Sequence, residues 1–292
     1  MYVQDDVPRL HEQMLYCVVR IRSPKAGGSG TLIYSGKNAS GEYSTFVLTN
    51  WHVIDSALTI KEEWDPIRGR NIKRETRATV SAERFRYKYL SEVVGGEMLD
   101  ADVVAYNKDE DLALVKLRTI DLAPYVARLF PRGKERDISI FTRVFACGCS
   151  LLHQPYPTEG RITAKSDEID NKRYWMSQAP ITYGNSGGAV FLADTLEFIG
   201  VPSRVSIQGW GDVANHMGFF IPPDRIYGFF EHEGYQFLYD SSLTEEQCAE
   251  MRSRRQKQAE RVEEMVARGV LPDSGATEPD EKKDSSESNP GK

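Results

Sequence analysis

The chain has 292 residues and a formal net charge of −6, with 40% hydrophobic and 27% charged residues. A chain of this length can bury one large core or two smaller ones, which excludes a mini-protein held together by disulfides. The mild acidity gives no electrostatic argument for a nucleic acid or an acidic membrane as a partner. No signal-peptide pattern opens the chain and no apolar run reaches the roughly 18 residues of a membrane span, so we expect a cytoplasmic protein.

Four cysteines, Cys17, Cys147, Cys149 and Cys248, are spread along the chain. Small secreted proteins use a much denser set to replace a core, so we expect free thiols here. Cys147, Cys149 and His153 could supply three zinc ligands, but a fourth is missing. The sequence therefore favours buried thiols, and we expect neither a metal nor a cofactor.

Between about residues 14 and 230, short apolar runs alternate with Gly, Pro, Asn and Ser. Many short strands separated by turn signals are typical of a sandwich or a barrel. Residues 118–137, with Pro, Gly and mixed charge, have the composition of a connector. We therefore predict an all-β protein with two β-barrels in tandem, at about 14–117 and 138–230.

One segment, residues 61–90, interleaves basic and aromatic side chains. Such interleaving can bind nucleic acid through phosphate contacts and base stacking. Its basic residues are diluted by Glu62, Glu63, Asp65, Glu75 and Glu83. We therefore predict a long, partly exposed hairpin and no nucleic-acid partner, and we place this hairpin near the functional cleft as a hypothesis.

The residues after the barrels differ in character. Thr244 and Gln247 have the spacing of a capping box, which predicts a helix over about 243–268. Gly269 and Pro272 would end that helix. Residues 270–292 contain almost nothing apolar, so burial cannot offset the entropy of ordering them, and we predict a disordered tail.

The sharpest chemical signal is the run Gly184-Asn-Ser186-Gly-Gly. A nucleophilic serine needs an exposed hydroxyl and nearby backbone N–H groups aimed at the oxyanion that develops during the reaction. Glycines beside it allow the sharp turn and the close approach to substrate that this requires. Read alone, the same run could be an ordinary turn between strands.

Two further residues complete a catalytic set. His52 lies just past an apolar strand, and Asp111 stands at the head of another. With the serine they supply a general base, an orienting acid and a nucleophile, each at a strand end. Read alone, the histidine could be structural and the aspartate a solvated loop residue. Asp102 and Asp109 are alternative acids, and Asp111 is preferred because a strand begins directly after it.

These motifs together resemble the trypsin-like serine peptidases, and most closely their HtrA branch. The resemblance is carried by Thr49-Asn-Trp-His52-Val, Asp111-Leu-Ala-Leu-Val-Lys and Gly184-Asn-Ser186-Gly-Gly, and it covers about residues 14–230. It implies a peptidase domain at 14–235, built from two six-stranded antiparallel barrels with the site in the cleft between them.

The resemblance also implies an endopeptidase that acts on protein or peptide substrates. His52 would deprotonate Ser186 while Asp111 orients the imidazole. The oxyanion hole would be the loop Gly184, Asn185 and Ser186, with the N–H groups of its first and last residues as donors.

This chain departs from the family in three respects. Secreted trypsins carry an aspartate where Asn185 stands, so activation by N-terminal cleavage is not expected. HtrA proteins usually add a PDZ domain, and the residues after 240 are too few and too helical or polar to form one.

The substrate pocket implied by the family comprises Pro180, Ile181, Val201, Pro202, Ser203 and Gly218. None of these pairs with Arg or Lys, so we expect cleavage after a small or medium apolar residue, with His216 as an alternative determinant that would favour an acidic one.

Two hypotheses without catalysis stay open. A pseudoprotease would hold peptides in the cleft without cutting them. Alternatively, the C-terminal helix and tail would bind a partner and the barrels would serve as a scaffold. A homo-oligomer is compatible with every one of these interpretations.

Overall fold

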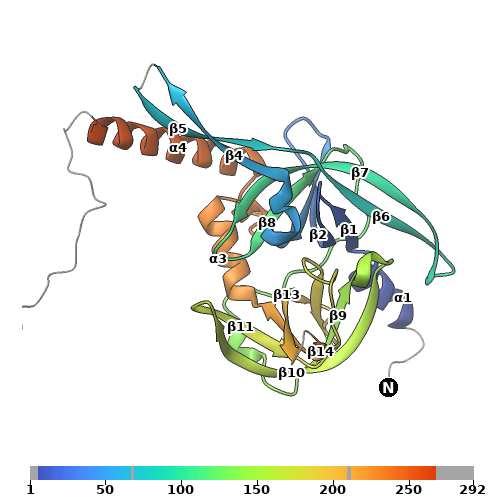
Figure 1. Cartoon of the computed structure of the whole chain (residues 1–292). Coiled ribbons are helices and arrows are strands. Elements are labelled where there is room, and N and C mark those ends of the chain that lie inside the picture. Colours follow the sequence, from blue (N-terminus) through green and yellow to red (C-terminus); the bar gives the residue numbers. More distant parts are fainter. Residues whose placement is uncertain (1–5, 67–68, 209–211, 268–292) are drawn as a thin grey trace, which may run out of the picture. The chain divides into compact units, whose positions relative to one another are not determined.

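Two closed antiparallel barrels hold most of the strands in the computed structural model, which describes residues 6–66, 69–208 and 212–267 (Figure 1). The predicted fold class, two six-stranded barrels followed by a C-terminal helix, is confirmed. The predicted tail, 270–292, lies outside the described residues. Both barrels belong to one unit, Met1–Cys248, and residues from Ala249 onward form a second unit.

The first barrel has the strand order β1-β2-β3-β8-β7-β6. Its strands are β1 (Val18–Arg22), β2 (Gly27–Lys37), β3 (Tyr43–Thr49), β6 (Val80–Lys88), β7 (Glu92–Asn107) and β8 (Leu112–Leu117). Pairing of β1 with β6 closes the ring. Its core is mainly aliphatic and includes Val19, Ile21, Leu32, Val47, Val103 and Val115. These residues suit a pleated, buried surface, which is why the short apolar runs form strands.

The second barrel has the order β10-β11-β14-β13-β12-β9. Its strands are β9 (Arg143–Gly148), β10 (Tyr156–Ile169), β11 (Lys172–Ser177), β12 (Ala189–Leu192), β13 (Phe198–Gln208) and β14 (Asp212–Ile221). Its core includes Val144, Ile162, Trp175, Val190, Ile199 and Phe220. The two separate cores are the reason that the chain forms two barrels.

The single hairpin predicted over 61–90 is wrong. Strands β4 (Leu58–Asp65) and β5 (Arg70–Arg77) pair with each other as a separate sheet that projects from the first barrel (Figure 1). The rest of the segment is β6, which pairs with β1 and β7. The physical reason is that Val80 and Ala82 are only 1% exposed and contribute to the barrel core, so the basic residues after them extend a barrel strand.

Helices occupy the ends of the described chain and one short connection. They are α1 (Val7–Leu10), α2 (Trp51–Ile54), α3 (Pro223–Glu233) and α4 (Glu245–Ala267). The capping box before α4 is confirmed: Thr244 N–H donates to Gln247 Oε1 at 2.9 Å, and Gln247 N–H donates to Thr244 Oγ1 at 3.2 Å. None of the described helices is both long and apolar enough to cross a membrane.

Candidate active site

His52 is positioned by the single helical turn α2, which follows β3. Its neighbours Val53 and Ile54 are buried in the core of the first barrel, with exposures of 2% and 0%. Burial of one side of a helical turn directs the residues on its other side outward. The His52 side chain is accordingly 41% exposed and borders the site cavities.

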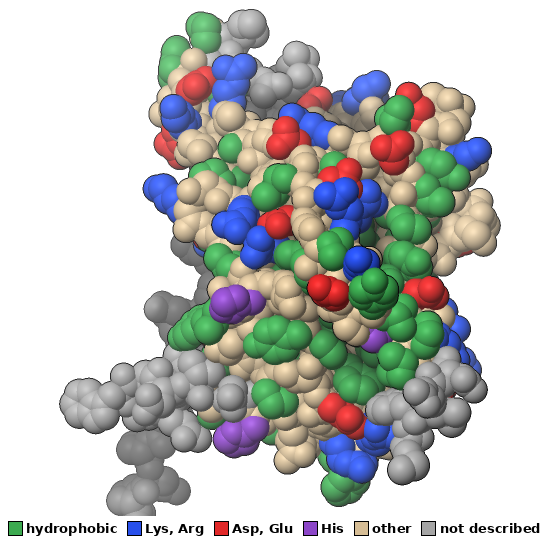
Figure 2. Space-filling model, turned by 90° about the vertical axis from the view of Figure 1, so that its right-hand side faces the viewer, with side chains coloured by type: hydrophobic (Ala, Val, Ile, Leu, Met, Phe, Trp, Pro, Cys, Tyr) green, Lys and Arg blue, Asp and Glu red, His purple; other side chains and the backbone are tan. Residues whose placement is uncertain are grey.

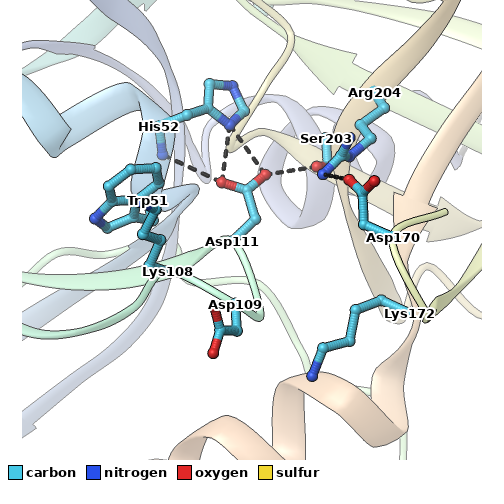
Figure 3. Close-up of a pocket in the computed structure, with 9 residues that line it drawn as sticks. All are labelled: Trp51, His52, Lys108, Asp109, Asp111, Asp170, Lys172, Ser203 and Arg204. Carbon is cyan, nitrogen blue, oxygen red and sulfur yellow. Dashed lines mark hydrogen bonds and ion pairs between the residues drawn. The ribbon is translucent and has the colours of Figure 1, made fainter.

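Asp111 stands at the head of β8 in the left-handed conformation, with φ of 52°. Its carboxylate oxygens both lie 2.9 Å from His52 Nδ1, which must donate because a carboxylate only accepts (Figure 3). Ser203 Oγ donates to the same carboxylate at 2.6 Å. Asn50 Nδ2 donates to the Asp111 carbonyl at 2.8 Å. The carboxylate is therefore fixed by both barrels, and it fixes the imidazole in turn.

The two alternative acids stand at exposed positions. Asp102 forms a two-point ion pair with Arg118, at 2.6 and 3.0 Å, on the surface of the first barrel. Asp109 is exposed at the rim of a cavity. Of these three aspartates, only Asp111 contacts His52 in the described structure.

The loop that carries Ser186 turns sharply at two glycines. Gly184 has φ of 94° and Gly187 has φ of 84°, a conformation that favours glycine. Asn185 between them is buried, and its N–H donates to the Thr182 carbonyl at 3.1 Å. The N–H groups of Gly184 and Ser186 donate to no acceptor within the described residues. The loop therefore presents two unengaged donors beside a half-buried serine.

Ser186 and His52 line the same cavity, which has a volume of about 210 Å³. No hydrogen bond joins their side chains in the described structure. Such contacts are often long in ligand-free enzymes and tighten when substrate binds. The structure thus places Ser186 and His52 at one cavity, with Asp111 in direct contact with His52.

The other residues lining this cavity are Ile181, Thr182, Tyr183, Asn185, Pro202, Ser203, Arg204 and Val205. The family resemblance predicts four of them, Ile181, Pro202 and Ser203 as pocket residues and Asn185 in the oxyanion loop. The sequence does not predict Thr182, Tyr183, Arg204 and Val205, although each stands within two residues of a predicted one.

The remaining predicted pocket residues do not line this cavity among the described residues. Pro180 and His216 are exposed, and Val201 is buried. Gly218 is also buried, and a Cβ placed on it would lie 2.5 Å from the Ile181 side chain. Gly218 therefore leaves room for the Ile181 side chain, which lines the cavity.

A second cavity, of about 590 Å³, also borders His52 and is lined by several charged residues (Figure 3). It is lined by Trp51, His52, Lys108, Asp109, Asp111, Asp170, Lys172, Ser203 and Arg204. Arg204 pairs with Asp170 at 2.9 Å, and the Lys108 ammonium lies 5.1 Å from the centre of the Trp51 ring. His52, Ser203 and Arg204 border both cavities. No residue of β4 or β5 lines either of them among the described residues.

The cysteines do not form a site. Cys147 and Cys149 are fully buried, whereas His153 is exposed. Burial raises the pKa of Cys149 to about 12 and also raises the pKa of Cys147, which disfavours the thiolate form that metals bind. No described group of three His, Cys, Asp or Glu residues is arranged to hold a metal ion.

Charge is also mixed on the one face of the molecule that Figure 2 shows. On the face in Figure 2, basic and acidic side chains are interspersed. This agrees with the mild net charge of the chain.

Comparisons with known proteins add a family and a fold. A family model described as the trypsin-like peptidase domain matches residues 28–201. No curated protein matches the chain. The structure of the serine endoprotease from Yersinia pestis is similar, with a TM-score of 0.53 and 19% identity over 80% of this chain and 67% of that one. The HtrA-type protease AlgW with tripeptide has a TM-score of 0.54 and 19% identity over 80% of this chain and 64% of its own. The chain thus spans about two thirds of these structures, which share its fold.

Proposed function

Since the chain belongs to the trypsin-like peptidase family, we propose that it is a serine endopeptidase with Ser186 as nucleophile, His52 as general base and Asp111 as orienting acid. The observation that supports this most directly is the contact of His52 Nδ1 with both Asp111 oxygens, at 2.9 Å. It lies at the cavity that Ser186 also lines.

The proposed reaction follows from which ring nitrogen carries the proton. Asp111 holds Nδ1 of His52 as a donor, so Nε2 is left to accept. Nε2 takes the hydroxyl proton as Ser186 Oγ attacks a peptide carbonyl, and it then gives that proton to the leaving amine. Water then attacks the acyl-enzyme carbonyl as Nε2 takes its proton, and that proton passes to Ser186 Oγ as the bond to the acyl group breaks and the carboxylic acid product leaves.

The oxyanion of the tetrahedral intermediate needs preorganised donors. In this proposal they are the N–H groups of Gly184 and Ser186, neither of which is engaged elsewhere in the described residues. Loss of one such donor typically lowers kcat by about 10²- to 10³-fold. The orientation of this loop should therefore control activity.

The cavity beside Ser186 supports a preference for small or medium apolar residues before the cleaved bond. Ile181, Pro202 and Val205 supply apolar walls, and no acidic side chain lines the cavity among the described residues. A lysine or arginine side chain would find no charge partner there. A peptide library cut mainly after lysine would contradict this part of the proposal.

The function is tested by reacting the purified protein with a fluorophosphonate probe and mapping the labelled peptide. We expect labelling at Ser186 that disappears in Ser186→Ala and in His52→Ala, and cleavage of an unfolded protein by the unsubstituted chain only. A folded protein that is neither labelled nor active would contradict the proposal and favour a pseudoprotease that only binds peptides.

A further inference from the structure

Ser29, in β2 of the first barrel, is fully buried and contacts the nucleophile loop of the second. Its backbone N–H donates to the Ser186 carbonyl at 2.8 Å. Its hydroxyl donates to the Gly184 carbonyl at 2.6 Å. The same hydroxyl accepts the Cys149 N–H at 2.7 Å, so both its donor and an acceptor position are used.

These contacts fix the loop peptide by peptide. The Ser186 N–H belongs to the peptide bond between Asn185 and Ser186. The carbonyls of the peptide bonds before and after it, those of Gly184 and Ser186, both accept hydrogen bonds from Ser29. The peptide that carries the Gly184 N–H is held by Leu151, whose N–H donates to the Tyr183 carbonyl at 2.7 Å. Both proposed oxyanion donors are therefore aimed by hydrogen bonds to neighbouring carbonyls.

Such external support is needed because Gly184 cannot fix its own backbone. Without a Cβ, glycine rotates into other conformations at little steric cost. Rotation of the peptide after Gly184 would turn its carbonyl away and leave the buried Ser29 hydroxyl without an acceptor for its proton. Unpaired buried groups are costly, so the hydroxyl opposes that rotation.

Ser29 is itself held in place by a residue close in sequence to the general base His52. Thr49, three residues before His52, donates from Oγ1 to the Ser29 carbonyl at 2.7 Å. Gly187 closes the space beside this contact, since a Cβ there would lie 2.2 Å from the Ser29 carbonyl oxygen. The strand that leads to the general base and the loop that carries the nucleophile therefore meet at one serine.

We propose that Ser29 is a positioning residue that orients the Ser186 N–H, one of the two proposed oxyanion donors, from the opposite barrel. The inference rests on the proposed peptidase function and adds to it a residue outside the three catalytic ones. It predicts that the Ser29 hydroxyl affects the transition state more than substrate binding.

The test is Ser29→Ala, which keeps the backbone contact and removes the hydroxyl. We expect kcat on a peptide substrate to fall about 10- to 100-fold with little change in KM, because a misaimed donor weakens only the oxyanion contact. A peptide aldehyde, which places an oxyanion in the same site, should lose affinity by a similar factor.

Ser35→Ala is a matched control in the same strand. The Ser35 hydroxyl bonds Thr45 Oγ1 at 2.9 Å and accepts the Ala123 N–H at 3.0 Å, contacts that do not reach the nucleophile loop. This variant should lose stability but keep kcat when it is assayed well below its melting temperature. Thr49→Val provides a second variant should Ser29→Ala not fold, and its kcat should fall less because it acts through Ser29.

The inference is overturned if the unsubstituted protein is active and both Ser29→Ala and Thr49→Val keep its kcat and its affinity for the aldehyde. The proposed function would then still stand. An equal fall in Ser35→Ala would also overturn it, because the effect would then be a general loss of stability. An unsubstituted protein with no turnover and no labelling would instead contradict the proposed function.

Discussion

At the level of single residues, the environment of Asp111 governs the site. Its carboxylate receives His52 from the first barrel and Ser203 from the second. A contact that needs both barrels can form only after both have folded and docked. The carboxylate that orients the proposed base therefore gains its full set of contacts only in the complete domain.

Replacing this carboxylate should have a large effect on catalysis. In Asp111→Asn the amide no longer holds Nδ1 of His52 as a donor, so the imidazole loses the useful tautomer, and we expect kcat to fall about 10⁴-fold. Asp109→Asn, at an exposed position, is the matched control and should keep its kcat. Full activity in Asp111→Asn together with loss of activity in Asp109→Asn would refute the choice of Asp111 as the acid.

The charged cavity allows a prediction about substrate preference. Arg204 and Asp170 form an exposed pair, with side-chain exposures of 42% and 72%, and such pairs are weak. We expect substrate residues next to the cleaved bond to lie against His52 and so to reach this cavity. Asp170→Asn should leave Arg204 without its carboxylate and raise kcat/KM for acidic peptides over neutral ones, by up to about fivefold.

The measurement is a competition between peptides that differ only by Glu or Gln in the residues before the cut. Arg204→Gln is the opposing control, and it should abolish any preference for Glu. Equal rates on both peptides in the Asp170→Asn protein would mean that substrate does not reach the cavity.

The sequence predicted some of these residues and not others. His52 and Ser186 belong to short motifs, so local patterns were sufficient to place them in one cleft. Asp111 was selected among three aspartates because a strand starts after it. The contacts of Ser203 and Ser29 were not predicted, since each joins residues more than 90 positions apart and no local pattern encodes them.

At the level of elements, local sequence signals predict those structures whose hydrogen bonds form within a few residues. The capping box predicted the start of α4 because its two hydrogen bonds are formed within four residues. The segment 61–90 was misassigned because its charge pattern does not show that Val80 and Ala82 enter a barrel core. That outcome depends on partners in β1 and β7, which are distant in the sequence.

The separate sheet β4–β5 should be dispensable for cleavage of short peptides. Its strands pair with each other, and Ile60 and Glu75 face one another across it. Replacing residues 61–74 by Asn-Gly, a two-residue hairpin turn, should keep that pairing. We expect kcat/KM for short peptides to stay within about twofold, because exposed hairpins tolerate deletion.

This replacement is compared with the unsubstituted protein on a short peptide and on an unfolded protein. A loss on both would show that the sheet supports the site. A loss on the protein alone would revive the hypothesis that this segment shapes substrate choice.

At the level of the whole molecule, Glu110 joins three parts of the fold next to the candidate acid. Its carboxylate accepts Lys172 Nζ, from the start of β11, and Arg225 Nε at 2.7 Å, from α3. The Arg225 guanidinium also lies 4.7 Å from the centre of the Tyr174 ring. Burial alone would raise the pKa of Glu110, but the hydrogen bonds from the two cations outweigh it and lower the pKa.

A lowered carboxyl pKa makes stability depend on pH in a defined direction. Above its ordinary pKa of 4.5, Glu110 is ionised in both states and contributes its full stabilisation. As the pH falls from there through the lower folded value, the unfolded chain binds the proton first and that stabilisation is lost. The free energy of unfolding should therefore decline more steeply in this acidic range for the unsubstituted protein than for Glu110→Gln.

Urea denaturation at a series of pH values on both sides of 4.5 measures this difference. Asp102→Asn is a useful comparison, because Arg118 also lowers the pKa of Asp102, but within the first barrel alone. Parallel stability curves for Glu110→Gln and the unsubstituted protein would show that the contact between barrels contributes nothing.

The reaction rates of the four buried thiols report how often the surrounding structure opens. Cys17, Cys147, Cys149 and Cys248 are all unpaired and fully buried. A thiol that does not meet solvent reacts with an alkylating reagent only during moments when the surrounding structure opens. Cys17 directly precedes the first barrel and Cys147 lies in the second, so mass spectrometry of the alkylated peptides would time the breathing of each barrel in one sample, without an introduced dye or a substitution.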